Sequence, residues 1–465
     1  MSFPKHAKYR DSGVEWLGQI PSHWRLQPLK RHARQLTEKT DRRQQPVALE
    51  NIESWTGRFI PTESEFEGEG VAFDSGDILF GKLRPYLAKA LVAQSFGEAV
   101  GDLIVMRLTD QAFSPFVAYQ LRSREVVSIV DGSTFGSKMP RASWDFVGAL
   151  PLPLPPCDEQ VAITAFLDAE TVKIDALVEE QRRLIELLKE KRQAVISQAV
   201  TKGLDPNAPM KDSGLEWLGR VPAHWDIAAV NYRYEVLLGK MLDEKRISGE
   251  HLAPYLRNVD VQWDRINCVD LPQMDFTGDD LQRYSLAQGD LLVCEGGDVG
   301  RAAIWQAELD ECYYQKALHR LRRRSSTRDH ARFMFYILRM ATALGVFESN
   351  GGKSTIAHLT AEALRRYRFA FPPCGEQEEI VALLDAQIRA LDALVVEAES
   401  ATLLLQERRA ALISAAVTGK IDVRDSTDLL AAWAETKADI AAGHFVSESA
   451  KAHVARARAM AKRDD

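Results

Sequence analysis

The strongest constraint on the fold of this 465-residue chain is an internal duplication. Residues 11–24 read DSGVEWLGQIPSHW and residues 212–225 read DSGLEWLGRVPAHW, so ten of the fourteen positions are identical. Residues 154–203 align with residues 371–420 without a gap, and 25 of these 50 positions are identical. Self-similarity of this extent indicates a repeated architecture. The chain is therefore predicted to fold as two copies of one unit, each with a tryptophan motif, a variable segment and a long repeated segment.

The long repeated segments are predicted to be helices. Residues 159–202 and 376–418 contain neither glycine nor proline. Each run has an expected N-cap before it and a glycine stop signal after it, namely Asp158 and Gly203 in the first copy and Gly375 and Gly419 in the second. A helix of this length would extend about 65 Å. Intrinsic propensity alone does not stabilise such a helix, so it needs a packing partner.

Apolar residues recur with heptad spacing along both predicted helices, which is typical of a coiled coil. The expected packing positions are Ile163, Leu167, Ile174, Leu177, Leu184, Leu188, Val195, Ile380, Leu384, Leu391, Leu394, Leu405 and Leu412. We therefore expect the two helices to pack on each other and act as a spacer. The alternative is that each helix is buried in its own domain.

The variable segments are predicted to be α/β (α+β) domains. Residues 25–153 and 226–370 share only short similarities, such as the Gly-Asp turns that begin at Gly76 and Gly289. Short apolar runs follow these turns and predict strands at 78–80, 103–106 and 291–293. Helical periodicity predicts helices over 113–130 and 331–345. Each segment is long enough to bury a core of its own.

The net charge is −7, from 59 Lys and Arg against 66 Asp and Glu, and an acidic balance argues against a nucleic-acid partner. Residues 316–371, however, hold twelve basic and three acidic residues, a local net of 12 − 3 = +9, which leaves −7 − 9 = −16 for the rest of the chain. Residues 25–43 are also basic. These stretches are either phosphate-binding surfaces or ordinary solvated faces.

The sequence predicts a soluble, cytoplasmic protein. Its five cysteines are odd in number and never spaced C-x-x-C, which disfavours a disulfide framework or a zinc cluster of cysteines. No apolar run reaches the roughly 18–20 residues that a membrane-spanning helix needs. The first ten residues carry charges and lack the apolar core of a signal peptide.

No catalytic motif is complete in the sequence. Residues 348–355 read ESNGGKST and resemble the end of a phosphate-binding loop, but Phe347 occupies the position of the required first glycine. The dinucleotide fingerprint, H-E-x-x-H and G-x-S-x-G are absent from the sequence. His23 and His224 recur beside Trp24 and Trp225, which favours a structural packing role. We predict no catalytic, cofactor or metal site in this chain.

Taken together, these residues resemble the specificity subunit of Type I restriction–modification systems. The resemblance covers residues 8–424 and rests on the two D-S-G-x-E-W-L-G-x-x-P-x-H-W motifs, the two P-P-C-x-E-Q helix starts and the G-D-[IL]-L turns. It implies two target recognition domains separated by two long antiparallel coiled-coil helices, in a pseudo-two-fold tandem repeat. Each domain would read one half of a bipartite site in double-stranded DNA.

The resemblance also implies partners. Two methyltransferase subunits would dock on the helices, restriction motor-nuclease subunits would join them, and S-adenosylmethionine, ATP and Mg would be bound by those partners. The expected domains are residues 1–156 (first recognition domain), 157–204 (first spacer helix), 205–373 (second recognition domain), 374–422 (second spacer helix) and 423–465 (a tail, expected to be helical).

The predicted DNA contacts are basic or aromatic residues in loops of the two domains and in the basic stretch. They are Lys82, Arg84, Tyr86, Lys138 and Arg141 in the first domain, and Arg301, Arg322, Arg324 and Lys353 in the second. Such side chains bind phosphates and read base edges. Two other functions remain open at this point: a coiled-coil scaffold that does not touch DNA, and a self-sufficient DNA-modifying enzyme.

Overall fold

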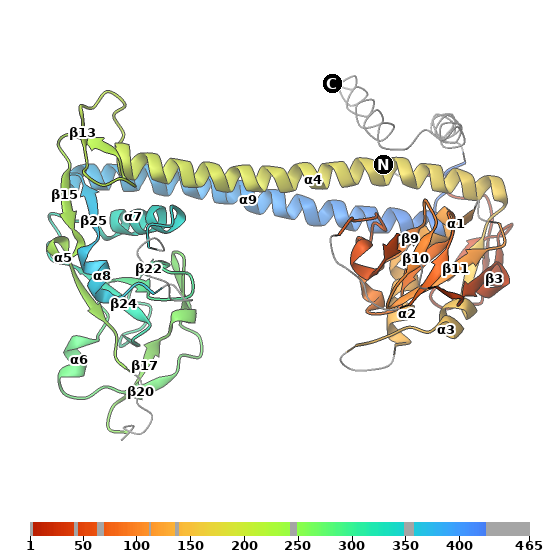
Figure 1. Cartoon of the computed structure of the whole chain (residues 1–465), viewed down its shortest axis with the longest axis horizontal. Helices are drawn as coiled ribbons and strands as arrows, with labels where there is room; N and C mark the ends of the chain where they lie inside the picture. The colour runs from red at the N-terminus through yellow and green to blue at the C-terminus, as the bar shows by residue number, and fades with distance from the viewer. Residues whose placement is uncertain are drawn as a thin grey trace. The chain divides into compact units, whose positions relative to one another are not determined.

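A computed structural model describes residues 3–40, 45–62, 69–110, 113–134, 139–241, 249–347 and 358–424. The chain divides into two compact units (Figure 1). Unit 1 contains residues 1–182 and 399–465, and unit 2 contains residues 183–398. Each unit therefore combines one variable segment with one end of each of two long helices. Both units are of mixed α/β composition, as the sequence predicted.

Unit 1 is built on two four-stranded sheets. The first is antiparallel, with the order β4 (Ala33–Leu36), β11 (Leu103–Leu108), β8 (Ile78–Gly81), β9 (Ala90–Val92). The second has the order β5 (Lys39–Thr40), β7 (Gly70–Phe73), β10 (Gly97–Ala99), β6 (Pro46–Val47), and β10 pairs with β6 in parallel. Two short antiparallel pairs complete the strands: β1 (Tyr9–Asp11) with β2 (Gln19–Pro21), and β3 (Arg25–Pro28) with β12 (Pro151–Leu154).

The helices of unit 1 outside the long pair are short. They are α1 (Ser114–Leu121), α2 (Arg124–Gly132) and α3 (Trp144–Ala149), with single 3-10 turns η1 (Leu29–Arg31), η2 (Leu49–Asn51) and η3 (Pro85–Leu87). The one helix expected over 113–130 is thus two, α1 and α2. The chain leaves the α-helical path between them, where Ser123 has an extended backbone.

Unit 2 repeats the order of the antiparallel sheet of unit 1. Its antiparallel sheet is β16 (Tyr234–Leu238), β24 (Leu318–Arg323), β21 (Leu291–Cys294), β22 (Ala302–Ile304). Its second sheet is β20 (Gln273–Asp275), β17 (Leu252–Leu256), β23 (Tyr313–Tyr314), again with one parallel pairing, between β17 and β23. The short pairs are β13 (Met210–Asp212) with β14 (Arg220–Pro222), β15 (Asp226–Ala229) with β25 (Arg368–Phe371), and β18 (Val261–Gln262) with β19 (Arg265–Ile266).

The shorter helices of unit 2 are α5 (Val230–Arg233), α6 (Asp279–Arg283), α7 (Ala331–Ala343), α8 (Ala361–Arg366) and the 3-10 turn η6 (Asn258–Asp260). The second copy therefore keeps the antiparallel sheet of the first although the two variable segments share little sequence, whereas the second sheets differ in strand number and order.

Strand alternation explains how each central sheet separates two cores. In β8, Ile78 and Phe80 face one apolar cluster and Leu79 faces the other. In β21, Leu291 and Leu292 separate in the same way between two clusters of unit 2. Successive side chains of a strand point to opposite faces, so a run in which every residue is apolar predicts a sheet covered on both sides.

The two long helices are α4 (Cys157–Lys202) and α9 (Cys374–Val417). The helices begin at the predicted segment bounds of 157 and 374, two residues before the glycine- and proline-free runs at 159 and 376, so Asp158 and Gly375 lie inside the first turn and the predicted N-caps are wrong. The preceding prolines mark the true starts, because proline has no N–H to leave unpaired there. Gly203 and Gly419 follow the helix ends with φ of 72° and 75°, the left-handed conformation that suits glycine.

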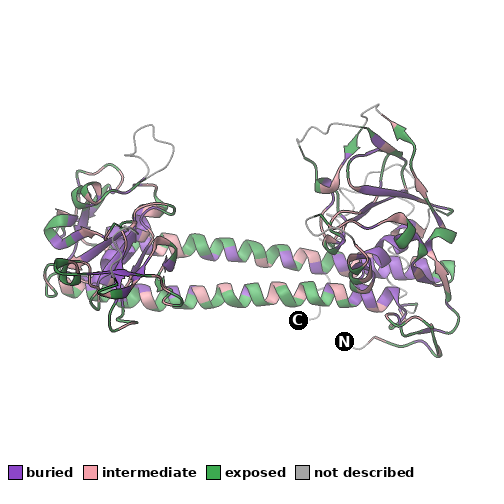
Figure 2. Cartoon of the chain, turned by 90° about the horizontal axis from the view of Figure 1, so that it is seen from below, coloured by how far each residue is buried: buried purple, intermediate pink, exposed green. Residues whose placement is uncertain are grey.

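The buried residues of α4 and α9 follow a heptad pattern, but one of its two rows is displaced from our prediction. The row through Leu167, Ile174 and Leu188, and through Leu384, Leu391 and Leu412 in the second copy, is buried. Ile163 and Ile380 are also buried, and Val195 and Leu405 are half-buried. Figure 2 shows this alternation of buried and exposed residues along both helices.

The predicted positions Leu177, Leu184 and Leu394 are wrong, since they are 46%, 43% and 48% exposed. Their neighbours one residue on, Val178 and Ile185, are buried instead. The apolar positions of a heptad are separated alternately by three and by four residues. The prediction placed the position after Ile174 three residues on, at Leu177, whereas the helix buries the residue four positions on, Val178. Both choices place an apolar residue at the position, so the pattern alone did not decide between them. No described helix is long and apolar enough to cross a membrane.

Candidate nucleic-acid interface

The tryptophan motif is fixed to the start of each long helix by one carboxylate. In unit 1, Trp24 Nε1 donates to Glu159 Oε1 at 3.0 Å, and His23 Nε2 lies 2.8 Å from Glu159 Oε2. In unit 2, the corresponding contacts of Trp225 and His224 with Glu376 are 3.0 and 2.7 Å. The repeated His-Trp pairs therefore have the packing geometry expected of them.

The repeated P-P-C-x-E-Q sequence is explained by the same junction. Its glutamate contacts the histidine and tryptophan side chains of the motif. Its glutamine turns back on the preceding loop, where Gln160 Nε2 donates to the Pro155 carbonyl and Gln377 Nε2 to the Pro372 carbonyl, both at 2.9 Å. These hydrogen bonds pair the carbonyl groups just before the helix and hold the preceding loop at the start of the helix. Sequence reasoning missed the acceptor role of the glutamate, although its repetition beside the glutamine was visible.

The repeated Gly-Asp turns are also structural. Asp77 accepts from Arg107 Nε at 2.7 Å, and Asp290 accepts from Arg322 Nε at 2.8 Å, so each turn is tied to the neighbouring central strand. Both aspartates are buried. Hydrogen bonding to Asp290 raises the pKa of Arg322. Arg322 therefore stabilises this turn through Asp290, whose side chain is 2% exposed, while its own side chain is 35% exposed. Its role as a DNA contact stays a prediction.

In unit 1 the structure brings four of the predicted DNA contacts together. They lie on the segment after β8 and on the strand-like segment before α3, where Leu83 and Arg141 form a β-bridge. The Arg84 N–H donates to the Pro140 carbonyl at 2.9 Å, and the Ala142 N–H donates to the Lys82 carbonyl at 2.9 Å. The two segments therefore form a single surface.

Asp102 organises the cations of this surface. Arg141 donates Nε and Nη2 to its two carboxylate oxygens at 3.0 Å each, and Lys82 Nζ lies 3.6 Å from Oδ1. The hydrogen bonds from Arg141 hold the pKa of the Asp102 carboxyl below its usual range. Sequence reasoning did not single out Asp102. Its signal was the Gly-Asp pair directly before strand β11.

Arg84 is the exposed cation of this surface. Its backbone is left-handed, with φ of 52°, and among the described residues its guanidinium has no hydrogen bond or ion pair. Tyr86, on the following 3-10 turn, is 45% exposed. The equivalent loop of unit 2 has glycine in this conformation, Gly297 with φ of 76°. A non-glycine residue pays about 1–2 kcal/mol for a left-handed backbone, so arginine is retained here against a conformational cost.

The predicted contacts of unit 2 are less well gathered. Arg301 is half-buried and donates to the carbonyl and side-chain oxygen of Asn258 at 3.1 and 2.8 Å. Arg324 is exposed, and its Nε donates to the Asn231 carbonyl at 2.8 Å. Among the described residues, Arg301 and Arg324 share no hydrogen-bond partner. Lys138 of unit 1 and Lys353 of unit 2 lie outside the described residues.

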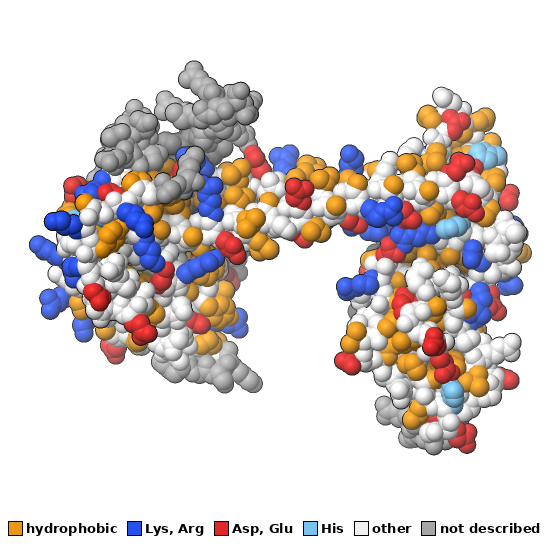
Figure 3. Space-filling model, turned by 180° about the vertical axis from the view of Figure 1, so that it is seen from behind, with side chains coloured by type: hydrophobic (Ala, Val, Ile, Leu, Met, Phe, Trp, Pro, Cys, Tyr) orange, Lys and Arg blue, Asp and Glu red, His pale blue; other side chains and the backbone are white. Residues whose placement is uncertain are grey.

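Internal ion pairs neutralise part of the basic block at 316–371. Arg332 pairs with Asp264 at 2.7 Å and with Asp385 of α9 at 2.9 Å, and Arg320 lies 3.2 Å from Glu235. The sequence count of +9 therefore overstates the free positive charge of unit 2. Figure 3 shows Lys and Arg side chains spread over one face of unit 1, the unit that holds the Arg84 surface.

The comparisons with known proteins agree with this arrangement. Residues 253–398 match the family model of the Type I restriction modification DNA specificity domain. The resemblance to Type I specificity subunits is confirmed. A curated relative, the Type I restriction enzyme EcoKI specificity subunit of Escherichia coli K12, is 27% identical over 205 residues, which are 43% of this chain and 40% of the relative. The chain thus matches about two fifths of that relative's length.

Two solved structures share the fold of this chain. One comes from work on complex assembly and conformational transition of the type I R-M system; it has 18% identity and a TM-score of 0.68, and the match covers 86% of this chain and 98% of that one. The other is the HsdS subunit of Thermoanaerobacter tengcongensis, with 17% identity, a TM-score of 0.52 and the same coverage. At these identities the likeness concerns the fold alone.

Proposed function

We propose that this chain is the DNA-specificity subunit of a Type I restriction–modification system. It binds double-stranded DNA, reads the two halves of an asymmetric bipartite site, and directs methyltransferase and restriction subunits there. The observation that carries the proposal is the pairing of one duplicated fold with two different loop surfaces. The junctions and the antiparallel sheets of the two units match, whereas the loop after the central strand contains Lys82 and Arg84 in one copy and Glu295 and Gly297 in the other.

We further propose that α4 and α9 run antiparallel along their whole length as a spacer between the two recognition domains. Two ion pairs support this arrangement. In unit 1, Arg409 Nε donates to Asp175 Oδ1 at 2.8 Å, and in unit 2, Arg192 Nη1 donates to Asp392 Oδ1 at 2.7 Å. The repeat offset of 217 residues converts one pair into the other, since 175 + 217 = 392 and 192 + 217 = 409. Such reciprocity is expected of two equivalent helices related by a pseudo-two-fold axis.

The exposed leucines of the helices support docking of two methyltransferase subunits. Leu177 and Leu187 in the first helix are 46% and 51% exposed, and their counterparts Leu394 and Leu404 are 48% and 67% exposed. Large apolar side chains exposed in groups mark protein-binding surfaces. Because each position occurs once per copy, the chain offers the same surface twice. The chain itself is non-catalytic in this proposal, and S-adenosylmethionine, ATP and Mg are bound by the partner subunits.

The decisive experiment is to sequence methylated bases in cells that co-express this chain with methyltransferase subunits. The proposal expects one bipartite motif with two different halves and a fixed gap. A continuous motif contradicts the two-domain reading. Methylation or cleavage of DNA by the purified chain alone favours a self-sufficient enzyme. A chain that forms protein complexes but shows no salt-dependent binding to duplex DNA is a scaffold.

The spacer is tested by lengthening both helices together. We insert one heptad after Glu180 in α4 and one after Leu403 in α9, positions that the reciprocal ion pairs put at the same level. Seven residues add about 10.5 Å of helix, which corresponds to roughly three base pairs at 3.4 Å per base pair. The methylated motif should keep both halves and gain about three base pairs in the gap. An unchanged gap would refute the spacer role.

A further inference from the structure

A buried histidine in unit 1 has an unusual environment. The side chain of His6 is 2% exposed, yet among the described residues neither ring nitrogen has a hydrogen-bond partner. The nearest carboxylates are too far for hydrogen bonds, with Glu159 Oε1 3.6 Å from Nε2 and Asp422 Oδ2 3.5 Å from Nδ1. Buried polar atoms are nearly always paired, so an imidazole left at these distances requires an explanation.

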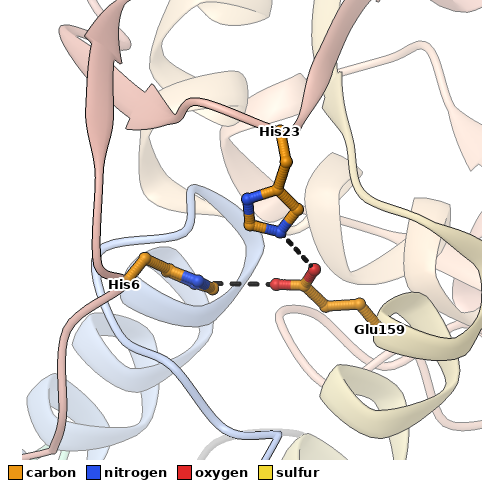
Figure 4. Close-up of side chains that lie close together, drawn as sticks. All are labelled: His6, His23 and Glu159. Carbon is orange, nitrogen blue, oxygen red and sulfur yellow. Dashed lines mark hydrogen bonds and ion pairs between the residues drawn. The ribbon is translucent and has the colours of Figure 1, made fainter.

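His6, His23 and Glu159 converge on one point (Figure 4). Their ligand atoms all lie within 4.8 Å of one another, with His6 beside one oxygen of the carboxylate and His23 beside the other. We propose that these three side chains bind a divalent transition metal ion of the zinc type. Two imidazoles and one carboxylate are a ligand set that Zn²⁺ accepts, with a further position for water. The fourth position faces solvent beside His23, whose side chain is 41% exposed.

The surroundings supply the outer contacts that such a site needs. Asp422 Oδ2 lies 3.5 Å from His6 Nδ1, close enough to accept a hydrogen bond from Nδ1–H after a small movement, which would leave Nε2 for the metal. Trp24 Nε1 holds Glu159 Oε1, so Oε2 is the oxygen directed at His23.

The place of the site in the chain gives the ion a structural purpose. Its ligands would join residues 3–9, through His6, to the tryptophan motif at His23 and to the first turn of α4 at Glu159. The segment that follows α9 packs against the same residues, since the Asp422 N–H donates to the Pro4 carbonyl at 2.8 Å and the Tyr9 hydroxyl to the Gly419 carbonyl at 3.1 Å. In unit 2 the residues that precede the motif are the continuation of α4, which ends at Lys202 before β13. In unit 1 residues 3–9 do not continue a helix, and the ion would fix them at the junction.

The second copy provides a matched comparison within the same molecule. It has the same histidine and glutamate, His224 and Glu376, 2.7 Å apart. The residue at the position of His6, however, is Asn207 under the repeat offset of 201. Unit 2 therefore has two of the three ligands, and we expect no ion there. The inference is independent of DNA binding, because all of its ligands lie in the junction.

The test measures zinc bound to the full-length chain. Protein stripped with a chelator is dialysed against Zn²⁺, and bound metal is determined by mass spectrometry and by calorimetric titration. We expect one ion per chain and a higher melting temperature with Zn²⁺ than after chelation. His6→Asn, which installs the residue of the second copy, should abolish both effects, and His224→Asn should leave both intact. Asp422→Asn should weaken zinc affinity about 10–100-fold.

Folding of the variants is checked separately by circular dichroism. If His6→Asn fails to fold, His23→Asn replaces it, because the half-exposed His23 contributes little to the core. Zinc well below one ion per chain in the wild type would overturn the proposal. So would equal zinc in the wild type and in both the His6 and His23 variants, since the ion would then be bound elsewhere.

Discussion

Arg84 offers the sharpest test of the proposed DNA surface, because its backbone and its side chain can be separated. The residue is exposed, left-handed at φ of 52°, and next to the exposed Tyr86. In Arg84→Gly the guanidinium is lost and the backbone conformation is relieved. In Arg84→Ala the guanidinium is lost and the backbone cost stays. Two variants with the same loss of charge therefore differ in conformational cost alone.

The expected free energies follow from these two terms. Relief of the left-handed backbone stabilises the glycine variant by about 1–2 kcal/mol, and the freedom of glycine in the unfolded chain costs about 0.5–1 kcal/mol. The free energy of unfolding should therefore rise by about 0–1.5 kcal/mol. Binding should weaken much more. A lost base contact costs about 1–3 kcal/mol, which is roughly 5- to 150-fold in Kd.

The assay measures binding of the full chain, co-purified with its methyltransferase subunits, to a duplex that carries the methylated motif. If Arg84 contacts a base, both variants lose affinity and one position of the first half-site becomes degenerate. If Arg84 contacts a phosphate, the slope of log K against log salt becomes shallower by about 0.9 without a change of motif. Lys173→Ala on α4, which removes an exposed cation away from the loop, is the control. Unchanged affinity, salt slope and motif in both Arg84 variants would refute the reasoning.

Three further predictions concern stability. Ile185→Ala should lower the free energy of unfolding by about 2–4 kcal/mol, whereas Leu184→Ala, at a 43% exposed position, should change it little. Denaturant titration compares the two variants. Equal losses of stability would support the heptad positions predicted from the sequence. Arg322→Ala removes two hydrogen bonds to the buried Asp290 and leaves the one from the Ala287 N–H, so it should cost about 1–3 kcal/mol in the same titration, whereas the loss of a residue that only contacts DNA would leave stability normal and weaken binding. Burial lowers the pKa of His319 to about 4, so the stability that its neutral form contributes is complete above pH 6.5 and is lost as the pH falls from 6.5 towards 4. In His319→Gln the melting temperature should depend less on pH over this range. An unchanged slope of melting temperature against pH would contradict the prediction.

The sequence was sufficient for the architecture but not for the details of packing. Duplication, absence of glycine and proline, and the apolar strands gave the two units, the long helices and the central strands. The sequence could not show which residues of α4 are buried, because Leu177 and Val178 are both apolar and either one fits the heptad spacing. Only the partner helix distinguishes them, and its contacts are long-range.

The candidate DNA surface was also only partly predictable, because it too depends on contacts between residues far apart in the sequence. Lys82, Arg84 and Arg141 were recognisable as loop cations, and folding brings them onto one surface. Arg322 has the same residue type, but its alternating position in β24 aims it at Asp290. Whether a cation is free or paired depends on acids from other strands. A count of charges along the chain cannot give that.

Under the proposed function, the two loops after the central strands indicate how one fold would read two sequences. Arg84 and Gly297 occupy equivalent positions and share the left-handed conformation, so the path of the backbone is kept. Two residues earlier the chemistry is reversed, with Lys82 in one copy and Glu295 in the other. A lysine can bind phosphate or guanine, whereas a carboxylate repels phosphate and accepts from the amino group of cytosine. Two loops of the same shape and opposite charge cannot prefer the same bases. The halves of the proposed site should therefore differ most at the base pairs that these loops approach.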